Sequence, residues 1–306
     1  MKKDLLTMKS LSKNEILEIL NLGDQLKYEK SHGIPHKLLK GKTLGMIFEK
    51  ASTRTRVSFE VAMNDLGGYP LFLSSNDLQI GRGEPICDTA RVLSRYIDAI
   101  MIRTFSQDEV NDLSKYSTIP VINGLTDLEH PCQVLADLMT IREYKNSFEG
   151  LKVCYIGDGN NMAHSLMVGC LKVCMNLSVA CPKDYSPLDD YIEYSKELAS
   201  LNKVNFELTT SPKEAIIDAD VVITDVWASM GQESESNKRK EAFKGFCVDS
   251  NLMNYAKDDA IVLHCLPAHR GEEITSEILD RYSPSIFDEA ENRLHAQKAV
   301  LVKLMS

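Results

Sequence analysis

The sequence predicts an α/β protein of two domains, each with a parallel sheet that is covered by helices on both faces. Three observations support this prediction. The 306 residues suffice for two hydrophobic cores. Short apolar runs alternate with segments of helical periodicity, which is typical of strands buried on both faces of a parallel sheet. A long helical segment near the middle of the chain interrupts this alternation, which then begins again.

The first half opens with a helix. Ser12 and Glu15 have the spacing of a capping box and stand directly before the apolar positions Ile16, Ile19 and Leu20. We expect this helix to end near residue 28. Apolar runs and helical patterns then alternate, and they predict strands at 43–48, 71–74, 98–103 and 120–124 and helices at 57–66, 88–96 and 110–116.

The second half repeats the pattern between two long helices. The first is expected from His130 to about Tyr144, and the last over 288–305. The stretch 229–243 is polar and highly charged, so we expect a solvated loop or a lid there. The remaining pattern predicts a helix at 162–173 and strands at 152–158, 178–181, 206–209, 221–226 and 261–266.

These elements place the domain boundary near 130–150. We expect a first domain over 1–133 and a second over 134–287. The C-terminal helix, 288–306, is expected to pack back on the first domain, so that the two long helices link the domains.

The bulk composition excludes several classes of protein. A net charge of −9 and a pI near 5.4 argue against a nucleic-acid-binding protein, which usually carries a basic surface. No run of about 18 apolar residues exists and the first residues lack an apolar core, so we expect neither a membrane span nor a secretory signal. Eight cysteines without a CxxC pair favour a reduced, cytoplasmic protein without a zinc site.

Hydroxyl and guanidinium groups are concentrated where the first predicted strand is followed by a helix, in Ser52, Thr53, Arg54 and Thr55. A helix N-terminus offers free N–H groups and the positive end of the helix dipole, so anions bind there. Hydroxyls and a guanidinium fork suit a phosphate dianion. The alternative is an ordinary N-cap serine beside surface arginines. The GxxxxGK[ST] pattern is absent, so a nucleotide P-loop is excluded.

Two more residues could join this anion site. Arg103 ends a predicted strand, at the sheet edge where open α/β folds bind ligands; read alone, it is a surface arginine. His130 opens a long helix, where the dipole disfavours the charged imidazole. A neutral imidazole can donate one hydrogen bond to a carbonyl oxygen, although a structural histidine is the common case. By itself the polar stretch 79–84 is only a loop.

The second half carries candidates for an amino-acid pocket. GDGNNMA (157–163) lacks the third glycine of a dinucleotide fingerprint, so we expect no nicotinamide cofactor. Asn160 and Asn161 instead place amides at a sheet edge, or cap the next helix. Asp225 could pair with an ammonium group, with Ser229 adding a hydroxyl. Cys265 lies in the same layer, or is simply a buried thiol. A phosphate-like pocket and an amino-acid-like pocket together suit group transfer between two small substrates.

Four motifs carry a resemblance that covers essentially the whole chain: FEKASTRTRVSFE (48–60), HPCQVLADLMT (130–140), DVWASMGQE (225–233) and HCLPAHRGEEI (264–274). Together they identify a sequence similar to the aspartate/ornithine carbamoyltransferase family. DVWASMG and HCLP resemble the ornithine-specific members. The family fold is two doubly wound α/β domains. One departure from the family pattern is Gly83, where a lysine is often seen.

The resemblance also implies roles for individual residues. The catalytic residues would be Arg103, His130, Cys265 and Arg293. Ornithine would be bound by Asn161, Asp225, Ser229 and Met230. Carbamoyl phosphate would be bound by Ser52, Thr53, Arg54, Thr55, Gln79, Arg103, His130, Gln133, Cys265, Leu266 and Arg293.

The implied activity is transfer of the carbamoyl group of carbamoyl phosphate to the δ-amine of L-ornithine, which gives L-citrulline and phosphate. No metal and no cofactor are expected. The resemblance implies a cytoplasmic homo-oligomer, at least a homotrimer, in which Gln79 reaches a neighbouring subunit's site. Alternatives are putrescine or an acylated ornithine as acceptor, a nucleotide-dependent oxidoreductase, and a non-catalytic protein that binds phosphorylated metabolites. Arginine synthesis and the reverse direction both stay open.

Overall fold

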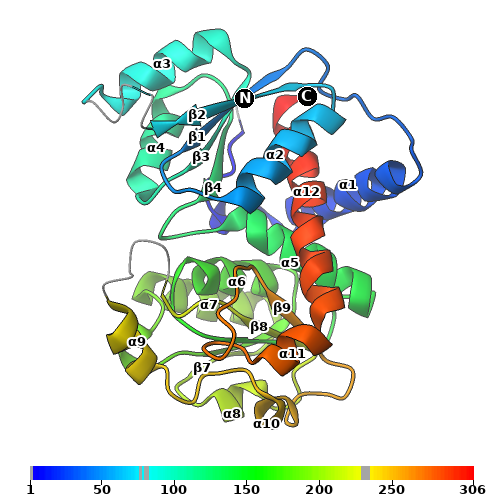
Figure 1. Ribbon diagram of the computed structural model, residues 1–306, viewed down its shortest axis with the longest axis vertical. Helices are drawn as coiled ribbons and strands as arrows, with labels where there is room; N and C mark the ends of the chain where they lie inside the picture. Colours follow the sequence, from blue (N-terminus) through cyan, green and yellow to red (C-terminus); the bar gives the residue numbers. More distant parts are fainter. Residues whose placement is uncertain (1–2, 76–77, 79–82, 229–234) are drawn as a thin grey trace. The chain divides into compact units, whose positions relative to one another are not determined.

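The computed structural model describes residues 3–75, 78, 83–228 and 235–306. It forms two compact units, one over Met1–Ala136 with Asn292–Ser306 and the other over Asp137–Glu291. Each unit is a parallel sheet with helices on both faces (Figure 1). The chain passes between the units inside two long helices, α5 (Pro131–Lys145) and α12 (Ser283–Met305).

The sheet of the first unit has the strand order β2-β1-β3-β4, and all its pairings are parallel. The winding direction reverses between β1 and β3. In open α/β sheets the carboxyl edge at such a switch point is where ligands bind. The strands are β1 (Thr43–Phe48), β2 (Tyr69–Ser74), β3 (Ala99–Arg103) and β4 (Val121–Leu125). The helices are α1 (Lys13–Ser31), α2 (Thr53–Asp65), α3 (Ile86–Tyr96) and α4 (Gln107–Tyr116).

The sheet of the second unit has the order β7-β6-β5-β8-β9, again fully parallel, with its switch point between β5 and β8. Its strands are β5 (Lys152–Ile156), β6 (Asn176–Ala180), β7 (Phe206–Thr209), β8 (Val221–Thr224) and β9 (Ile261–His264). Its helices are α6 (Asn161–Lys172), α7 (Asp189–Asn202), α8 (Pro212–Ile216), α9 (Ser236–Ala242), α10 (Ser250–Met253) and α11 (Ser276–Arg281).

The prediction of two doubly wound parallel sheets is confirmed, with local differences. Helix α2 begins at Thr53, not at 57, because Ser52 caps it and the hydroxyl-rich segment forms its first turn. Helix α7 was not predicted. The loop expected over 229–243 is wrong in part, because Ser236–Ala242 is helical. The capping box of Ser12 and Glu15 is present at the start of α1.

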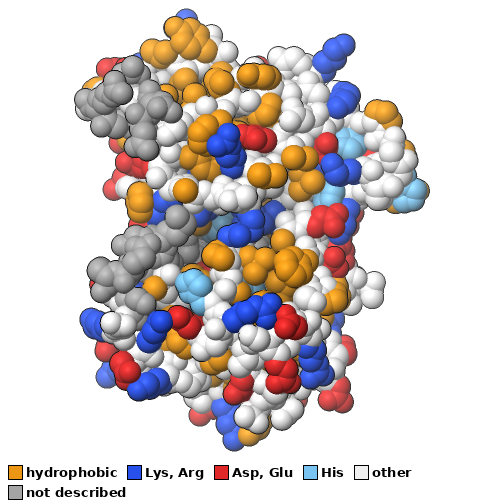
Figure 2. Space-filling model, in the orientation of Figure 1, with side chains coloured by type: hydrophobic (Ala, Val, Ile, Leu, Met, Phe, Trp, Pro, Cys, Tyr) orange, Lys and Arg blue, Asp and Glu red, His pale blue; other side chains and the backbone are white. Residues whose placement is uncertain are grey.

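The surface agrees with the acidic composition. Basic and acidic side chains are interspersed over the face drawn in Figure 2. Among the described residues, no helix combines the length and the apolar character that crossing a bilayer requires.

Gly159 is required by a close approach of two loops at the carboxyl edge of the second sheet. Its N–H donates to the carbonyl oxygen of Tyr185 at 2.8 Å. A Cβ atom at this position would lie 2.2 Å from the nitrogen of Pro187 and 2.3 Å from the carbonyl carbon of Ser186. Because both are backbone atoms, no side-chain rotation relieves the overlap. Glycine therefore holds the loop after β5 against the segment after β6.

A buried histidine ties α12 to the rest of the first unit. His36 accepts a hydrogen bond at Nε2 from the Nζ of Lys298, 3.0 Å away, so the proton of the neutral ring sits on Nδ1. Nδ1 lies 3.2 Å from the carbonyl oxygen of Ile34 and 3.3 Å from a carboxylate oxygen of Glu29. Burial, and then the charge of Lys298, lower the pKa of His36 below its ordinary value.

This histidine makes stability depend on pH. Because its folded pKa lies below its unfolded value of about 6.5, the unfolded chain binds the proton more readily. The free energy of unfolding should therefore fall as pH drops below about 6.5. In urea titrations between pH 5 and 7.5, the His36→Leu variant should show a shallower dependence than the wild type. Equal slopes for the two proteins would contradict this role of His36.

Candidate active site

The junction of β1 and α2 combines a helix cap with a chain of hydroxyls. The Oγ of Ser52 accepts the backbone N–H of Thr55 at 3.2 Å, which is the N-cap interaction. The same Ser52 hydroxyl donates to the Oγ1 of Thr55, 3.1 Å away, and Thr55 is fully buried. The N-cap interpretation of Ser52 is therefore confirmed, and the anion site stays a prediction for which the hydroxyls at this helix N-terminus are suitably placed.

Two guanidinium groups converge on the hydroxyl of Thr55. Arg103, the last residue of β3, donates from Nη1 at 3.4 Å. Arg293, on α12, donates from Nη2 at 2.9 Å. The other terminal nitrogen of Arg293 donates to the Oε1 of Gln133 on α5. The first unit thus brings together residues from β1–α2, β3, α5 and α12, and both arginines are buried.

His130 lies close to the same cations. It directly precedes α5 and is buried. Burial lowers its pKa well below the ordinary value, and the charges of Arg293, Arg103 and Arg54 lower it further, in that order. The imidazole is therefore neutral near pH 7 and above. Its surroundings hold three positive charges beside it, an arrangement that suits a dianionic ligand.

Three more residues are expected members of this site. Thr53 is exposed at the first position of α2, and Arg54 follows it with a partly buried side chain. Gln79 lies outside the described residues, so its expected role stays a prediction.

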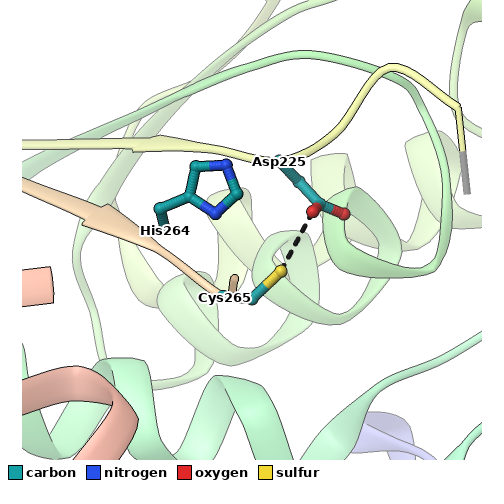
Figure 3. Close-up of side chains that lie close together, drawn as sticks. All are labelled: Asp225, His264 and Cys265. Carbon is teal, nitrogen blue, oxygen red and sulfur yellow. Dashed lines mark hydrogen bonds between the residues drawn. The ribbon is translucent and has the colours of Figure 1, made fainter. Parts of the chain in front are cut away.

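A carboxylate and a thiol meet at the carboxyl edge of the second sheet. Figure 3 shows the thiol of Cys265, after β9, pointing to the carboxylate of Asp225, after β8. The Sγ donates to Oδ1 at 3.0 Å, and the backbone N–H of Val226 donates to the same oxygen at 2.8 Å. Desolvation, and then the negative charge of Asp225, raise the pKa of the Cys265 thiol well above its ordinary value. The thiol is therefore a donor and not a nucleophile.

His264 is held in one tautomer. Its Nε2 lies 3.0 Å from Oε1 of the fully buried Glu273, and its Nδ1 accepts the backbone N–H of Leu266 at 2.9 Å. Because Nδ1 accepts a hydrogen bond, the proton of the neutral ring sits on Nε2, which donates to Glu273. Ligand-type atoms of Asp225, His264 and Cys265 lie within 4.8 Å of one another. A metal ion bound by His264 would have to replace one of these two hydrogen bonds of the imidazole. We therefore interpret His264 as the residue that holds the backbone of Leu266, whose φ of 56° lies in the left-handed region.

Asn160 and Asn161 differ in their positions at the start of α6. Asn160 caps α6, because its Oδ1 accepts the N–H of Met162 at 2.9 Å, and its Nδ2 lies 3.5 Å from Oδ2 of Asp225. The structure thus brings Asn160 to Asp225. Asn161, to which the family resemblance assigns ornithine binding, is buried at the first position of α6. Ser229 and Met230 lie outside the described residues.

Sequence reasoning missed two residues at this edge. Asp158 and Arg239 form a buried ion pair between the loop after β5 and α9, with Nη1 and Oδ2 2.7 Å apart. In the sequence Arg239 stands in a charge run that looks like a solvated face, so no local signal distinguishes it.

Comparisons with known proteins identify the family to which both parts of the chain are similar. Residues 3–143 match the carbamoyl-phosphate-binding domain of aspartate/ornithine carbamoyltransferases, and residues 149–304 match their aspartate/ornithine-binding domain. The chain belongs to the aspartate/ornithine carbamoyltransferase family. A family member from Anoxybacillus flavithermus, an ornithine carbamoyltransferase, is 57% identical over 303 residues, which are 99% of this chain and 96% of that protein. One from Methanosarcina mazei is 54% identical over 305 residues and 100% of both chains.

Solved structures of carbamoyltransferases share the fold. Ornithine carbamoyltransferase from Pyrococcus furiosus matches with a TM-score of 0.95 and 53% identity, over 99% of this chain and 97% of that one. The anabolic enzyme from Campylobacter jejuni matches with a TM-score of 0.94 and 45% identity, over 99% and 98% of the two chains.

The anion site can be tested with one substitution and a control on the same helix. Arg54→Gln should weaken binding of inorganic phosphate at least tenfold, or about 1.4 kcal/mol, because a charge-assisted contact is lost. Arg56→Gln is the matched control. The Arg56 side chain lies over the ring of Phe72, 3.7 Å from its centroid, and pairs with Glu60.

Isothermal titration at low ionic strength measures both affinities, and thermal unfolding checks the fold. Equal loss of phosphate affinity in the two variants would remove Arg54 from the site.

Proposed function

We propose that this carbamoyltransferase carries the carbamoyl group of carbamoyl phosphate to the δ-amine of L-ornithine, with L-citrulline and phosphate as products. The observation that carries the proposal is the convergence of Arg103 and Arg293 on Thr55, beside a neutral His130. This set supplies positive charge for a phosphate and hydrogen-bond donors for a carbonyl oxygen. The family membership supports the reaction class, and the names of the relatives support ornithine.

The charge and the donors of the second unit support an amino acid as the acceptor. Asp225 and Cys265 present a carboxylate and a protonated thiol, with the Asn160 amide near the carboxylate. A carboxylate attracts the ammonium of an amino acid and repels the side-chain carboxylate of aspartate. We assign ornithine binding to Asn161, Asp225, Ser229 and Met230. We also assign the first unit to carbamoyl phosphate and the second to ornithine.

The first unit supplies the binding and polarisation of carbamoyl phosphate. Ser52, Thr53 and Arg54, with the N-terminus of α2, hold the phosphate. As the amine attacks, negative charge develops on the carbonyl oxygen, and donors placed there stabilise it by about 3 kcal/mol each. We assign this task to Arg103, Thr55 and His130. Gln133, which Arg293 orients, binds the carbamoyl amide, and Cys265 with Leu266 adjoins the reacting groups.

Proton transfer sets a second requirement. The attacking amine must be neutral, and for an amine with a lysine-like pKa this costs roughly 3 kcal/mol near pH 8. A pocket with several arginines lowers the pKa of a nearby amine, because like charges disfavour the protonated form. Cys265 keeps its own proton, so it orients the amine and does not take its proton. Carbamoyl phosphate is an activated donor, and the proposed chemistry uses positioning and charge stabilisation without a cofactor.

The state in the cell belongs to the same proposal. We propose a cytoplasmic homotrimer with shared sites, in which Gln79 reaches a neighbouring subunit, on the strength of the family resemblance. A role in arginine synthesis is supported by relatives that are named anabolic, from Pyrococcus furiosus and Campylobacter jejuni. Light scattering of the purified protein measures the oligomer.

The decisive experiment is a panel of acceptors. With carbamoyl phosphate, the purified protein should form citrulline from L-ornithine at least a hundredfold more efficiently, in kcat/KM, than it carbamoylates putrescine, N-acetylornithine or L-aspartate. That preference corresponds to about 2.7 kcal/mol. A faster reaction with any other acceptor would replace ornithine in the proposal, and no turnover with all four would end it.

Thr55 gives a residue-level test of the charge stabilisation. Thr55→Val keeps the shape but removes the hydroxyl that accepts from Arg103 and Arg293. We expect kcat to fall about hundredfold, because one donor to the developing charge is worth about 3 kcal/mol. Thr55→Ser keeps the hydroxyl and should retain most of the activity. Similar kcat values for the valine and serine variants, in steady-state assays of citrulline, would exclude this role.

A further inference from the structure

Arg239, on α9, is more buried than its place in a charge run suggests. Only 6% of the residue is exposed. Nη1 donates to the Oδ2 of Asp158 at 2.7 Å and to the carbonyl oxygen of Trp227 at 2.8 Å. Its Nε donates to Glu235 at 3.3 Å, and its guanidinium lies 4.8 Å from the ring centroid of Tyr185. One guanidinium therefore contacts three loops and its own helix.

These loops all leave the carboxyl edge of the second sheet. Asp158 follows β5, Tyr185 follows β6, and Trp227 follows β8. Trp227 stands two residues after Asp225, and Asp158 stands two residues before Asn160. Asn160 and Asp225 both belong to the proposed acceptor pocket, where Nδ2 of the first and Oδ2 of the second lie 3.5 Å apart. Each of them is thus two positions along the chain from a residue that Arg239 contacts. A rigid fork with several donors can hold such separate groups in register, which a single ammonium cannot.

The ion pair is a costly way to join these loops. Burial raises the pKa of Asp158 to about 6, although the charge and the hydrogen bond of Arg239 lower it. A buried pair contributes little net stability compared with apolar side chains, whereas removing one partner leaves an uncompensated charge. A role in geometry explains its position at the ligand edge better than a role in stability does.

We propose that Arg239 is a positioning residue for the acceptor. By holding Asp158 and the Trp227 carbonyl, it fixes the loops after β5 and β8, and so keeps Asn160 and Asp225 in the arrangement that binds the ammonium-bearing substrate. The inference rests on the proposed function for the identity of that substrate. It adds a residue that does not itself touch the substrate.

The test separates acceptor binding from donor binding. Arg239→Gln should raise the KM for L-ornithine at least tenfold and leave the KM for carbamoyl phosphate within twofold. Arg239→Lys keeps the charge but reaches fewer acceptors, so its KM for ornithine should lie between those of the wild type and the glutamine variant. Lys257→Gln is the matched control, because Lys257 pairs with the buried Asp220, which directly precedes β8 and so lies at the end of the strand away from Asp225. This variant should leave the KM values for ornithine and for carbamoyl phosphate unchanged.

A second variant covers a failure to fold. Arg239→Met combined with Asp158→Asn removes both buried charges, so no buried ion is left unpaired, and Glu235, the other partner of Arg239, is half exposed. This double variant should again raise only the KM for ornithine. Trp227 is the single tryptophan of the chain, and its fluorescence reports on the held loop directly. Acrylamide should quench it at least twofold more strongly in the Arg239 variants than in the wild type or in Lys257→Gln.

The outcomes distinguish this inference from the proposed function. A wild type that forms no citrulline rejects the function. Active, folded Arg239 variants with an unchanged KM for ornithine, or with equal increases for both substrates, reject the inference. Unchanged quenching of Trp227 in the double variant rejects the loop-holding role even if the single variants do not fold.

Discussion

The proposed donor site depends on a concentration of positive charge that a protein interior would ordinarily disfavour. Two buried guanidinium groups, from β3 and α12, converge on one threonine hydroxyl at the start of α2. Burial, and then the charges of these arginines, lower the pKa of His130 and keep its imidazole neutral. Like charges so arranged repel one another, and a dianionic ligand relieves that repulsion. The phosphate affinity that we propose for this site and part of the downward shift in the pKa of His130 therefore share one electrostatic origin.

The second unit has charge of the opposite sign at the carboxyl edge of its sheet. Its edge holds negative charge, on Asp225 and Asp158, next to neutral donors. Cys265 keeps its proton, and His264 has its ring nitrogens engaged with Glu273 and Leu266. These groups can orient an amine without competing for its proton. The carbamoyl transfer that we propose would use the cationic residues of the first unit for a dianion and the anionic residues of the second for an amino acid.

The proposed site in each unit uses the same property of the fold. In each sheet the winding direction reverses, between β1 and β3 and between β5 and β8, and the proposed ligand residues follow these strands. Loops that leave a parallel sheet in opposite directions open space at its carboxyl edge. Gly159 keeps one such loop close to its neighbour, because a side chain there would meet backbone atoms. The chemistry is thus carried by loops that rigid strands and close packing hold in place.

The sequence by itself determined the fold class and the cluster of hydroxyl and guanidinium groups at the start of α2. Period and turn residues are local signals, so strands such as Thr43–Phe48 and Phe206–Thr209 could be predicted with their boundaries. The hydroxyls and the guanidinium at 52–55 were visible because they are neighbours in the chain.

Only the tertiary structure decided which distant residues meet. Arg293 reaches a hydroxyl 238 positions away, and Arg239 reaches a carboxylate 81 positions away. Nothing local marks either pairing, because an arginine on a helix has the same pattern whether it faces solvent or a buried acid. The family resemblance implied a role for Arg293, whereas the positioning role that we propose for Arg239 follows only from its contacts. The physical reason is that a buried charge must be paired, and whether a charge is buried depends on the packing of the folded chain and not on the local sequence.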